Sequence, residues 1–404
     1  MNSNNKGRRH FIGVAGMGIA GAAVMPSWVR ANVTTRERKV RMGIVGGRFG
    51  LSFQFHNHPD CTVEAVSDLI PARREKLMST YRCQKSYPSL ELLLNDRNVD
   101  AVFIATGAPD HARHVIASLK AGKHVLCAVP AAMTLDECSE ILETVKMTGL
   151  TYMMAETSIW RQSMISAKKF YREGAFGNLM KAAAQYHHPG LESLYFENGQ
   201  KTWRYGLPPM LYPTHCTGFL VGMTRERLTE VTCLGWGDND PICRDNVYQN
   251  PFWNETAFFK TAGGMAFQVE VNWKGALRHG ERAEWHGDKM SFIMTQGPNS
   301  PDLLVKAGER MALDDGGFNV AANVVEEFKV PEWWRTEMLP EPLRHNSGHE
   351  GSHTFITHEF IDSIMKDRTP EVDIFQALAF TAPGIVAHQS ALKGGELLKI
   401  PDFG

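Results

Sequence analysis

The sequence predicts an α/β fold that begins with a doubly wound parallel sheet. Between residues 39 and 155, runs of apolar and β-branched residues alternate with helical stretches, and strand, helix and strand in that order give right-handed crossovers between parallel strands. A glycine-rich turn at residues 46–50 follows the first strand, and Asp68 ends the second strand about 20 residues further on. These features indicate a sheet that binds a dinucleotide at the carboxyl ends of its strands.

Each expected element follows from an apolar run and the residues that end it. Strands are expected at residues 40–45, 62–67, 99–105 and 124–128, and helices at 51–57, from near Pro71, at 110–121 and at 135–148. Pro130 ends the last of these strands, and Thr134 with Glu137 forms the Thr-x-x-Glu capping box that starts a helix. Residues 128–130 are therefore expected at the boundary between a cofactor site and a substrate site.

The glycine-rich turn is expected to hold the pyrophosphate of the dinucleotide. Glycines let the backbone approach the phosphates, and a helix after the turn would offer free amides and the positive end of its dipole. The loop is one residue shorter than the G-x-G-x-x-G fingerprint. The residues assigned to it are Gly46, Gly47, Arg48, Phe49 and Gly50.

Asp68 is the candidate for recognising the adenosine ribose. Its carboxylate would accept hydrogen bonds from the ribose hydroxyls and repel a 2′-phosphate, which favours NAD over NADP. The alternative is that Asp68 caps the helix that begins near Pro71. Arg73 and Arg74 lie close by in the sequence and keep NADP possible.

The first 31 residues are predicted to be a twin-arginine export signal. Arg8 and Arg9 precede an apolar run at residues 14–25, and Ala31 ends a small-residue cleavage pattern. The run is shorter than the roughly 20 residues that a membrane span needs, so no membrane anchor is expected after signal removal. The alternative is a basic, disordered start. The signal predicts a periplasmic protein that folds before export, often around a tightly held cofactor.

The composition limits the classes of partner and the compartment of folding. The formal charge is −1 with no basic stripe, which argues against nucleic acid. Seven cysteines show no metal-ligand spacing, so reduced core thiols are expected, consistent with folding before export. The remainder is long enough for two domains, expected at residues 38–155 and 156–404.

Three segments resemble the Gfo/Idh/MocA family, of the glucose-fructose oxidoreductase and inositol dehydrogenase type. They are residues 101–106, His111, and residues 121–127 with Pro130. The resemblance implies a Rossmann domain followed by an α/β domain with a large open, mainly antiparallel sheet, often in a homo-oligomer. It also implies that Thr106 and His111 lie beside the cofactor, as do Val129 and Pro130. Without the resemblance, His111 would be interpreted as a helix N-terminal residue.

The sequence departs from this family at residues 128–130. The usual Glu-Lys-Pro, whose lysine assists proton transfer at the substrate hydroxyl, is replaced by Ala128-Val129-Pro130. Valine cannot relay a proton, so either catalysis has been lost or other groups perform it. Val-Pro-Ala-Ala at residues 129–132 and Tyr-Pro-Thr-His at 212–215 are similar to NAD-dependent glycoside hydrolases resembling α-N-acetylgalactosaminidase.

That second resemblance implies catalytic roles for His215 and Tyr212. A histidine with a near-neutral pKa suits a general acid or base, and a tyrosine hydroxyl can donate or pass a proton. The aspartate that the dehydrogenases carry four residues before the histidine is replaced by Leu211. The alternative is that Tyr212 and His215 cap a helix at residues 217–223.

Several further residues are candidates for substrate binding. Trp160 takes the place of a tyrosine in the hydrolases and could stack on a sugar ring, and His349 lies in a glycine-rich loop before a helix expected at 354–366. The complete set is Glu156, Trp160, Tyr186, His188, Trp203, Arg204 and His349. The paired histidines at 187–188 have no further ligands at zinc spacing, so no metal is expected. The charged stretch at 281–284 is expected to be structural, with Arg282 as a possible ligand.

The predicted function is that of an NAD(P)-dependent oxidoreductase acting on a sugar or glycoside. The missing lysine and the Tyr-Pro-Thr-His motif favour redox-neutral glycoside cleavage through transient oxidation at C3 and elimination. One alternative is a conventional sugar or cyclitol dehydrogenase with a tightly bound cofactor, and another is a non-catalytic sugar-binding protein. The apolar alternation around residues 256–273 and 282–292 predicts the large sheet, and a helix is expected at 376–393.

Overall fold

The computed structural model describes residues 38–404 except 278–279, 295–299 and 312–319. The export signal predicted at residues 1–31 lies outside the described residues. Among the helices of the described part, none combines the length and the apolar character that crossing a bilayer requires.

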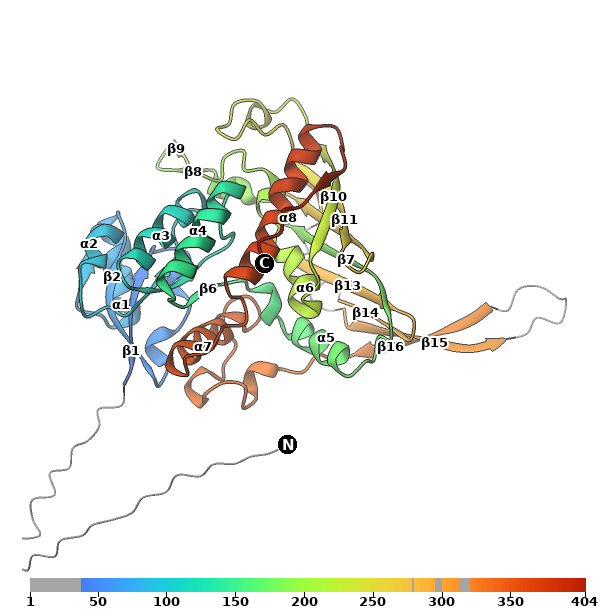
Figure 1. Ribbon diagram of the computed structural model, residues 1–404, viewed down its shortest axis with the longest axis horizontal. Helices are drawn as coiled ribbons and strands as arrows, with labels where there is room; N and C mark the ends of the chain where they lie inside the picture. Colours follow the sequence, from blue (N-terminus) through green and yellow to red (C-terminus); the bar gives the residue numbers. More distant parts are fainter. Residues whose placement is uncertain (1–37, 278–279, 295–299, 312–319) are drawn as a thin grey trace, which may run out of the picture. The chain divides into compact units, whose positions relative to one another are not determined.

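The first sheet of the described chain is the predicted parallel sheet (Figure 1). Its strands run in the order β3-β2-β1-β4-β5-β6, and all neighbours pair in parallel. They are β1 Val40–Val45, β2 Cys61–Ser67, β3 Ser86–Tyr87, β4 Ala101–Ile104, β5 His124–Cys127 and β6 Tyr152–Met154. The helices between them are α1 Pro71–Tyr81, α2 Leu90–Leu94, α3 His111–Lys120 and α4 Leu135–Thr148. The order reverses beside β1, so ligands are expected at the carboxyl ends of β1 and β4.

Helix α4 begins where the sequence predicts. The Thr134 hydroxyl accepts a hydrogen bond from the Glu137 amide at 3.2 Å, and the Glu137 carboxylate accepts one from the Thr134 amide at 3.2 Å. Gly149 ends the helix in the left-handed region, with φ 64°. The capping box is therefore formed as expected.

The helix expected at residues 51–57 is absent. Two 3₁₀ turns, Phe49–Leu51 and Phe55–Asn57, replace it. Gln54 lies between them in the left-handed region, with φ 60°, which interrupts a right-handed helix. Phe53 and Phe55 are fully buried and contact Phe103. The apolar residues at 51–57 therefore reflect packing into the core and not the spacing of a helix.

The second sheet is mixed and mostly antiparallel. Its order is β16-β15-β14-β13-β7-β12-β11-β10-β17, in which only the β7 and β12 pair of the described strands is parallel. The strands are β7 Leu179–His187, β10 Leu228–Trp236, β11 Asn254–Thr261, β12 Ala266–Asn272, β13 Gly280–Gly287, β14 Met290–Ile293, β15 Asp302–Met311, β16 Val320–Phe328 and β17 Leu398–Lys399. This is the large sheet that the resemblance implies.

Helices connect the two sheets into one unit. Helix α6, Thr214–Thr224, contacts β7, β12 and β13, and α8, Ile374–Leu392, contacts α6 and β10 as well as α4 and β6 (Figure 1). Helix α7, Ser352–Met365, contributes buried residues to the core that lies against β1. The remaining long helix is α5, Gln162–Arg172. The predicted helices at 354–366 and 376–393 are confirmed, and the C-terminal segment packs against both sheets.

Candidate active site

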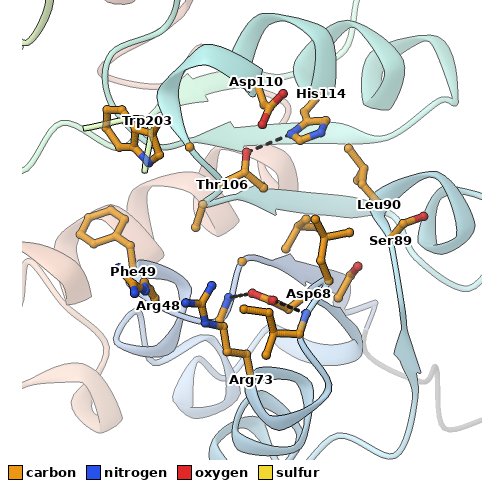
Figure 2. A pocket seen from close by; sticks show the side chains of 18 of the residues that line it. Arg48, Phe49, Asp68, Arg73, Ser89, Leu90, Thr106, Asp110, His114 and Trp203 are labelled. Carbon is orange, nitrogen blue, oxygen red and sulfur yellow. Dashed lines mark hydrogen bonds between the residues drawn. The ribbon is translucent and has the colours of Figure 1, made fainter. Parts of the chain in front are cut away.

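A pocket of about 460 Å³ lies at the carboxyl ends of β1, β2 and β4. Figure 2 shows Asp68, Arg48 and Arg73 on one side of it, across from Thr106, Asp110 and His114. The segment that follows β7 also lines it, with residues Leu194, Glu197, Thr202, Trp203 and Arg204. The pocket is therefore where the sequence predicts the dinucleotide, and both parts of the chain contribute walls.

Two glycines of the turn, and Gly107 in the loop after β4, leave no room for a side chain. Gly46 has φ +107°, and a Cβ there would lie 2.3 Å from the Ala105 carbonyl oxygen. A Cβ on Gly47 would lie 2.6 Å from the Arg73 Cβ, and one on Gly107 would lie 2.8 Å from the Trp203 ring. Such a turn lets a bulky anion approach the backbone closely.

Two details of the turn differ from the sequence prediction. Since a 3₁₀ turn follows it, the expected helix dipole is not available to the phosphates. Gly50 does not line the pocket, and its carbonyl oxygen accepts a hydrogen bond from the Tyr81 hydroxyl. Gly46, Gly47, Arg48 and Phe49 all line the pocket.

Asp68 fastens the glycine turn and faces the pocket. One carboxylate oxygen accepts from the Gly47 amide at 2.7 Å, and the other accepts from the Ile70 amide at 2.8 Å. Helix α1 has Ile70 as its N-cap and no side-chain capping bond, so the capping alternative for Asp68 is not realised. Each carboxylate oxygen keeps a second lone pair for a ribose hydroxyl. With the glycine cradle, these residues fit NAD.

The loop after β4 is only partly exposed to the pocket. Thr106 lines it, and the Thr106 hydroxyl lies 2.9 Å from His114 Nδ1. His111 is buried outside the lining, with Nδ1 2.7 Å from the Pro130 carbonyl oxygen and Nε2 3.2 Å from the Thr106 carbonyl oxygen. Val129 and Pro130 are also buried and lie outside the lining. His111 thus ties two loops together behind the pocket wall.

A buried charged cluster surrounds His215. Its Nδ1 lies 2.9 Å from a Glu156 carboxylate oxygen and 3.7 Å from a Glu281 carboxylate oxygen. Arg161 donates from Nε to Glu281 at 2.9 Å and also pairs with Glu350 at 2.5 Å. The Glu156 oxygen that faces His215 accepts from the Ser158 amide at 2.9 Å as well. The two carboxylates therefore hold the imidazole in one orientation, with Nδ1 toward their oxygens, and the guanidinium holds one of these carboxylates in place.

The cluster makes His215 a stronger base than an ordinary histidine. Burial alone would lower the pKa of His215, but the Glu156 and Glu281 charges outweigh it and raise the pKa above 6.5. Burial opposes ionisation of Glu281, yet the charges of Arg161 and His215 prevail and lower its pKa to about 2. The His215 ring is thus poised to accept a proton and hold it.

The same three side chains could geometrically hold a cation. Potential ligand atoms of Glu156, His215 and Glu281 lie within 4.8 Å of one another, the only such group among the described residues. The Arg161 guanidinium already neutralises Glu281, and a divalent ion there would add to the positive charge in a buried site. The donor set therefore fits a proton-holding cluster better than a metal site.

Aromatic side chains connect this cluster to the dinucleotide pocket. The rings of Tyr186 and Tyr212 lie 4.7 Å and 5.3 Å from the His215 ring, and Trp203 lies 6.5 Å from Tyr212. The Arg204 guanidinium lies 4.2 Å from the Trp203 ring centroid and 5.5 Å from that of Tyr212. Trp203 and Arg204 also line the pocket, so these ring contacts link Tyr212 and His215 to the pocket wall, although neither of the two lines the pocket itself.

Tyr212 and His215 do not cap the helix as the alternative proposes. Helix α6 begins at Thr214 and includes His215, with Pro213 as N-cap and no side-chain capping bond. Burial raises the pKa of Tyr212, and the Arg204 charge only partly offsets this effect. Tyr212 is therefore a neutral hydroxyl at pH 7, with a cation beside it.

Trp160, His188 and His349 have different surroundings. Trp160 stacks on Phe355 at 5.6 Å with 4° between the rings, so the protein itself covers one face. His188 lies 5.7 Å from the Tyr186 ring. His349 Nδ1 lies 2.8 Å from His353 Nε2, and burial lowers the pKa of His349, an effect that the nearby Glu281 charge opposes and His215 adds to. His188 and His349 thus border the charged cluster, whereas Trp160 has a packing partner.

Residues 281–284 lie in strand β13, as the sequence predicts. Arg282 donates to Gln185 across the sheet at 2.6 Å, while Glu281, which the sequence prediction does not single out, is buried beside His215. Strand alternation was the available signal, because Glu281 shares a face with the fully buried Trp285. For Arg161 the local sequence contains no such signal.

Comparisons with known proteins agree with this geometry. Residues 40–156 match the model described as "Oxidoreductase family, NAD-binding Rossmann fold", Gfo/Idh/MocA, and residues 306–404 match "Glycosyl hydrolase 109, C-terminal domain". A glycosyl hydrolase family 109 protein of Shewanella amazonensis is 32% identical, over 92% of this chain and 87% of that protein. One from Solibacter usitatus is 25% identical, over 78% and 74%.

A solved structure shows the same fold. Levoglucosan dehydrogenase in complex with NADH and L-sorbose is 16% identical, with a TM-score of 0.70, and covers 91% of this chain and 100% of its own. The chain belongs to glycosyl hydrolase family 109, and it is an NAD-dependent enzyme whose N-terminal part is a Rossmann domain of the Gfo/Idh/MocA oxidoreductase family.

Proposed function

We propose that the protein cleaves a glycoside in a redox-neutral reaction that passes through a transient ketone at C3 of the sugar. The observation that carries this proposal is the continuity between the dinucleotide pocket and the His215 cluster through Trp203 and Arg204. Val129 in place of a lysine and the glycosyl hydrolase names of the relatives also support it. The proposed substrate is a carbohydrate, whose hydroxyls would form hydrogen bonds with Tyr212 and with the polar groups of Arg204 and His215 beside it.

The residues that line the pocket would hold the cofactor. The glycine turn would receive the pyrophosphate, and the Asp68 carboxylate would receive the ribose hydroxyls. When bound, NAD supplies a reversible hydride acceptor for C3, so that no net oxidation accumulates. We include tight retention of NAD in the proposal, because residues from both parts of the chain enclose the pocket.

His215 is the proposed base for the C3 hydroxyl. Its raised pKa and its two carboxylate partners allow it to take the hydroxyl proton while the carbon loses hydride. Glu156 and Glu281 hold the ring and stabilise the imidazolium that results. When the ketone is reduced at the end of the cycle, His215 returns the proton to the oxygen.

Tyr212 is the proposed proton carrier at C2. The C3 ketone acidifies the C2 proton, its removal forms a C1–C2 double bond, and the group on C1 leaves with a proton. Water then adds its hydroxyl to C1 and a proton to C2. Arg204, whose guanidinium lies 5.5 Å from the Tyr212 ring, partly offsets the rise in the Tyr212 pKa that burial causes, and so lessens the cost of the phenolate that this transfer requires. Tyr186, which stacks on Tyr212, is the proposed sugar-binding residue beside it.

The test is to follow aglycone release and 340 nm absorbance together on a panel of chromogenic α- and β-glycosides. Catalytic aglycone release without a lasting rise in absorbance supports the proposal and identifies the sugar. Absorbance that rises with an oxidised sugar and an intact glycosidic bond makes the protein a dehydrogenase. Retention of sugar without either signal makes it a binding protein.

We also propose export by the twin-arginine route to the periplasm. Arg8 and Arg9 before the apolar run at 14–25 support this proposal. Replacing both arginines by lysine should leave the protein in the cytoplasmic fraction, which fractionation of a producing strain measures. Unchanged periplasmic recovery would contradict it.

A further inference from the structure

A carboxylate from outside the Rossmann sheet reaches into the dinucleotide pocket. Glu197 lies on strand β8, Phe196–Glu197, which forms a separate hairpin with β9, Gln200–Lys201. Its Oε1 accepts from Arg48 Nη2 at 2.6 Å and also from Arg73 Nη2. One carboxylate oxygen therefore engages two guanidinium groups at once.

The two arginines lie where the adenosine ribose is expected. Arg48 belongs to the glycine turn, and Arg73 of helix α1 packs its Cβ against Gly47. Both line the pocket together with Asp68, at the end of β2 where Rossmann sheets hold this ribose. Figure 2 shows Arg48 and Arg73 directed toward the same region of the pocket beside Asp68. Guanidinium groups in this place are what a 2′-phosphate needs for binding.

We propose that Glu197 selects NAD against NADP by occupying Arg48 and Arg73. Both guanidiniums pair with Glu197, and the Asp68 carboxylate lines the same pocket, so a 2′-phosphate would meet two carboxylates and no uncommitted arginine of this pair. Arg74 is also engaged, because it donates to the Asp68 carbonyl oxygen at 2.7 Å. The inference rests on the proposed use of the dinucleotide pocket and adds a specificity residue that lies outside the Rossmann sequence pattern.

In this proposal the discrimination between NAD and NADP depends on the charge of Glu197 and not on the size of its side chain. Glu197→Gln keeps the size of the side chain and removes one negative charge, which leaves two arginines free to bind a phosphate. We expect NADP⁺ to bind at least about 10-fold more tightly, which is about 1.4 kcal/mol. NAD⁺ has no phosphate at this position, so its dissociation constant should change by less than about 3-fold.

The experiment measures the dissociation constants of both dinucleotides on the full-length protein after any co-purified cofactor has been removed. Quenching of tryptophan fluorescence serves as the readout, since Trp203 lines the pocket, and calorimetry checks it. Glu192→Gln is the matched control, because Glu192 is exposed on the same segment and outside the lining. The double variant Arg73→Ala with Glu197→Gln should lose the gain in NADP⁺ affinity.

The outcomes separate the possible roles of Glu197. A selective gain for NADP⁺ that Arg73→Ala reverses supports the inference. Unchanged NADP⁺ affinity overturns it. An equal loss of affinity for both dinucleotides also overturns it, because Glu197 would then only hold the pocket closed around either one. A wild-type protein that binds no NAD⁺ would overturn the proposed function itself, independently of any change at Glu197.

Discussion

Replacing Glu281 by glutamine should remove a pH-dependent part of the protein's stability. Glu281 is buried 2.9 Å from Arg161 Nε and 3.7 Å from His215 Nδ1. Burial opposes its charge, but these two cations lower its pKa from 4.5 to about 2 in the folded protein. Because the unfolded chain binds this proton more readily, the stabilisation is present above pH 4.5 and is lost as the pH falls toward 2.

The magnitude follows from the two pKa values. The full difference corresponds to about 3 kcal/mol at about 1.4 kcal/mol per pKa unit. Integrating the linkage between pH 7 and pH 3 gives about 2 kcal/mol, since the last part is lost only below pH 3. The free energies of unfolding of the wild type and of Glu281→Gln should therefore converge by about 2 kcal/mol over this range.

Urea unfolding at several pH values between 7 and 3 measures this convergence. Glu326→Gln is a suitable control, because Glu326 lies on β16 of the same sheet and its ion pair with Lys306 is exposed. The control should change stability by less than about 1 kcal/mol at any pH. If the difference between wild type and Glu281→Gln stays constant between pH 7 and pH 3, the electrostatic reasoning for this cluster is refuted.

Three further predictions concern single residues. Gly46→Ala should abolish NAD⁺ binding in a calorimetric titration, because its Cβ would lie 2.3 Å from the Ala105 carbonyl oxygen. In Glu156→Gln, activity should persist to lower pH than in the wild type. The wild-type rate is expected to fall as His215 is protonated through a pKa above 6.5, and the variant lacks one of the two carboxylates that raise this pKa. Thr134→Ala should lower the free energy of unfolding in urea by about 1 kcal/mol through loss of the α4 cap.

Each of these predictions has a contrary result. Gly122→Ala is the control for the turn, because Gly122 also has a positive φ of +77° but no atom within 4 Å of an added Cβ. Equal effects of the two alanines would contradict the close-approach argument. A pH profile of Glu156→Gln that coincides with the wild type would remove His215 as the titrating base. Unchanged stability of Thr134→Ala would show that packing alone sets the start of α4.

Local signals in the sequence predicted much of the fold. The parallel sheet follows from short buried strands between helices, and α4 follows from its capping box and from Gly149. The expected helix at 51–57 failed because Phe53 and Phe55 are apolar for tertiary reasons, while Gln54 adopts a left-handed conformation that no local residue type demands.

The candidate site was predictable where its residues lie in motifs. His215, Tyr212 and the glycine turn come from short segments with recognisable spacing. Arg161 meets Glu281, and Glu197 meets Arg48 and Arg73, only in the folded chain, so no motif spacing could identify these pairs. Charged residues of this kind are usually exposed, and only their burial or pairing reveals a role.

The most direct test of the proposed mechanism is to run the cleavage in D₂O and to locate deuterium in the released sugar. Elimination and water addition require that C2 loses its proton and regains one from solvent. The account predicts one deuterium at C2 of every product molecule, with no lasting gain in 340 nm absorbance. A product that keeps its original hydrogen at C2 would contradict the account, because direct hydrolysis at C1 leaves that bond untouched.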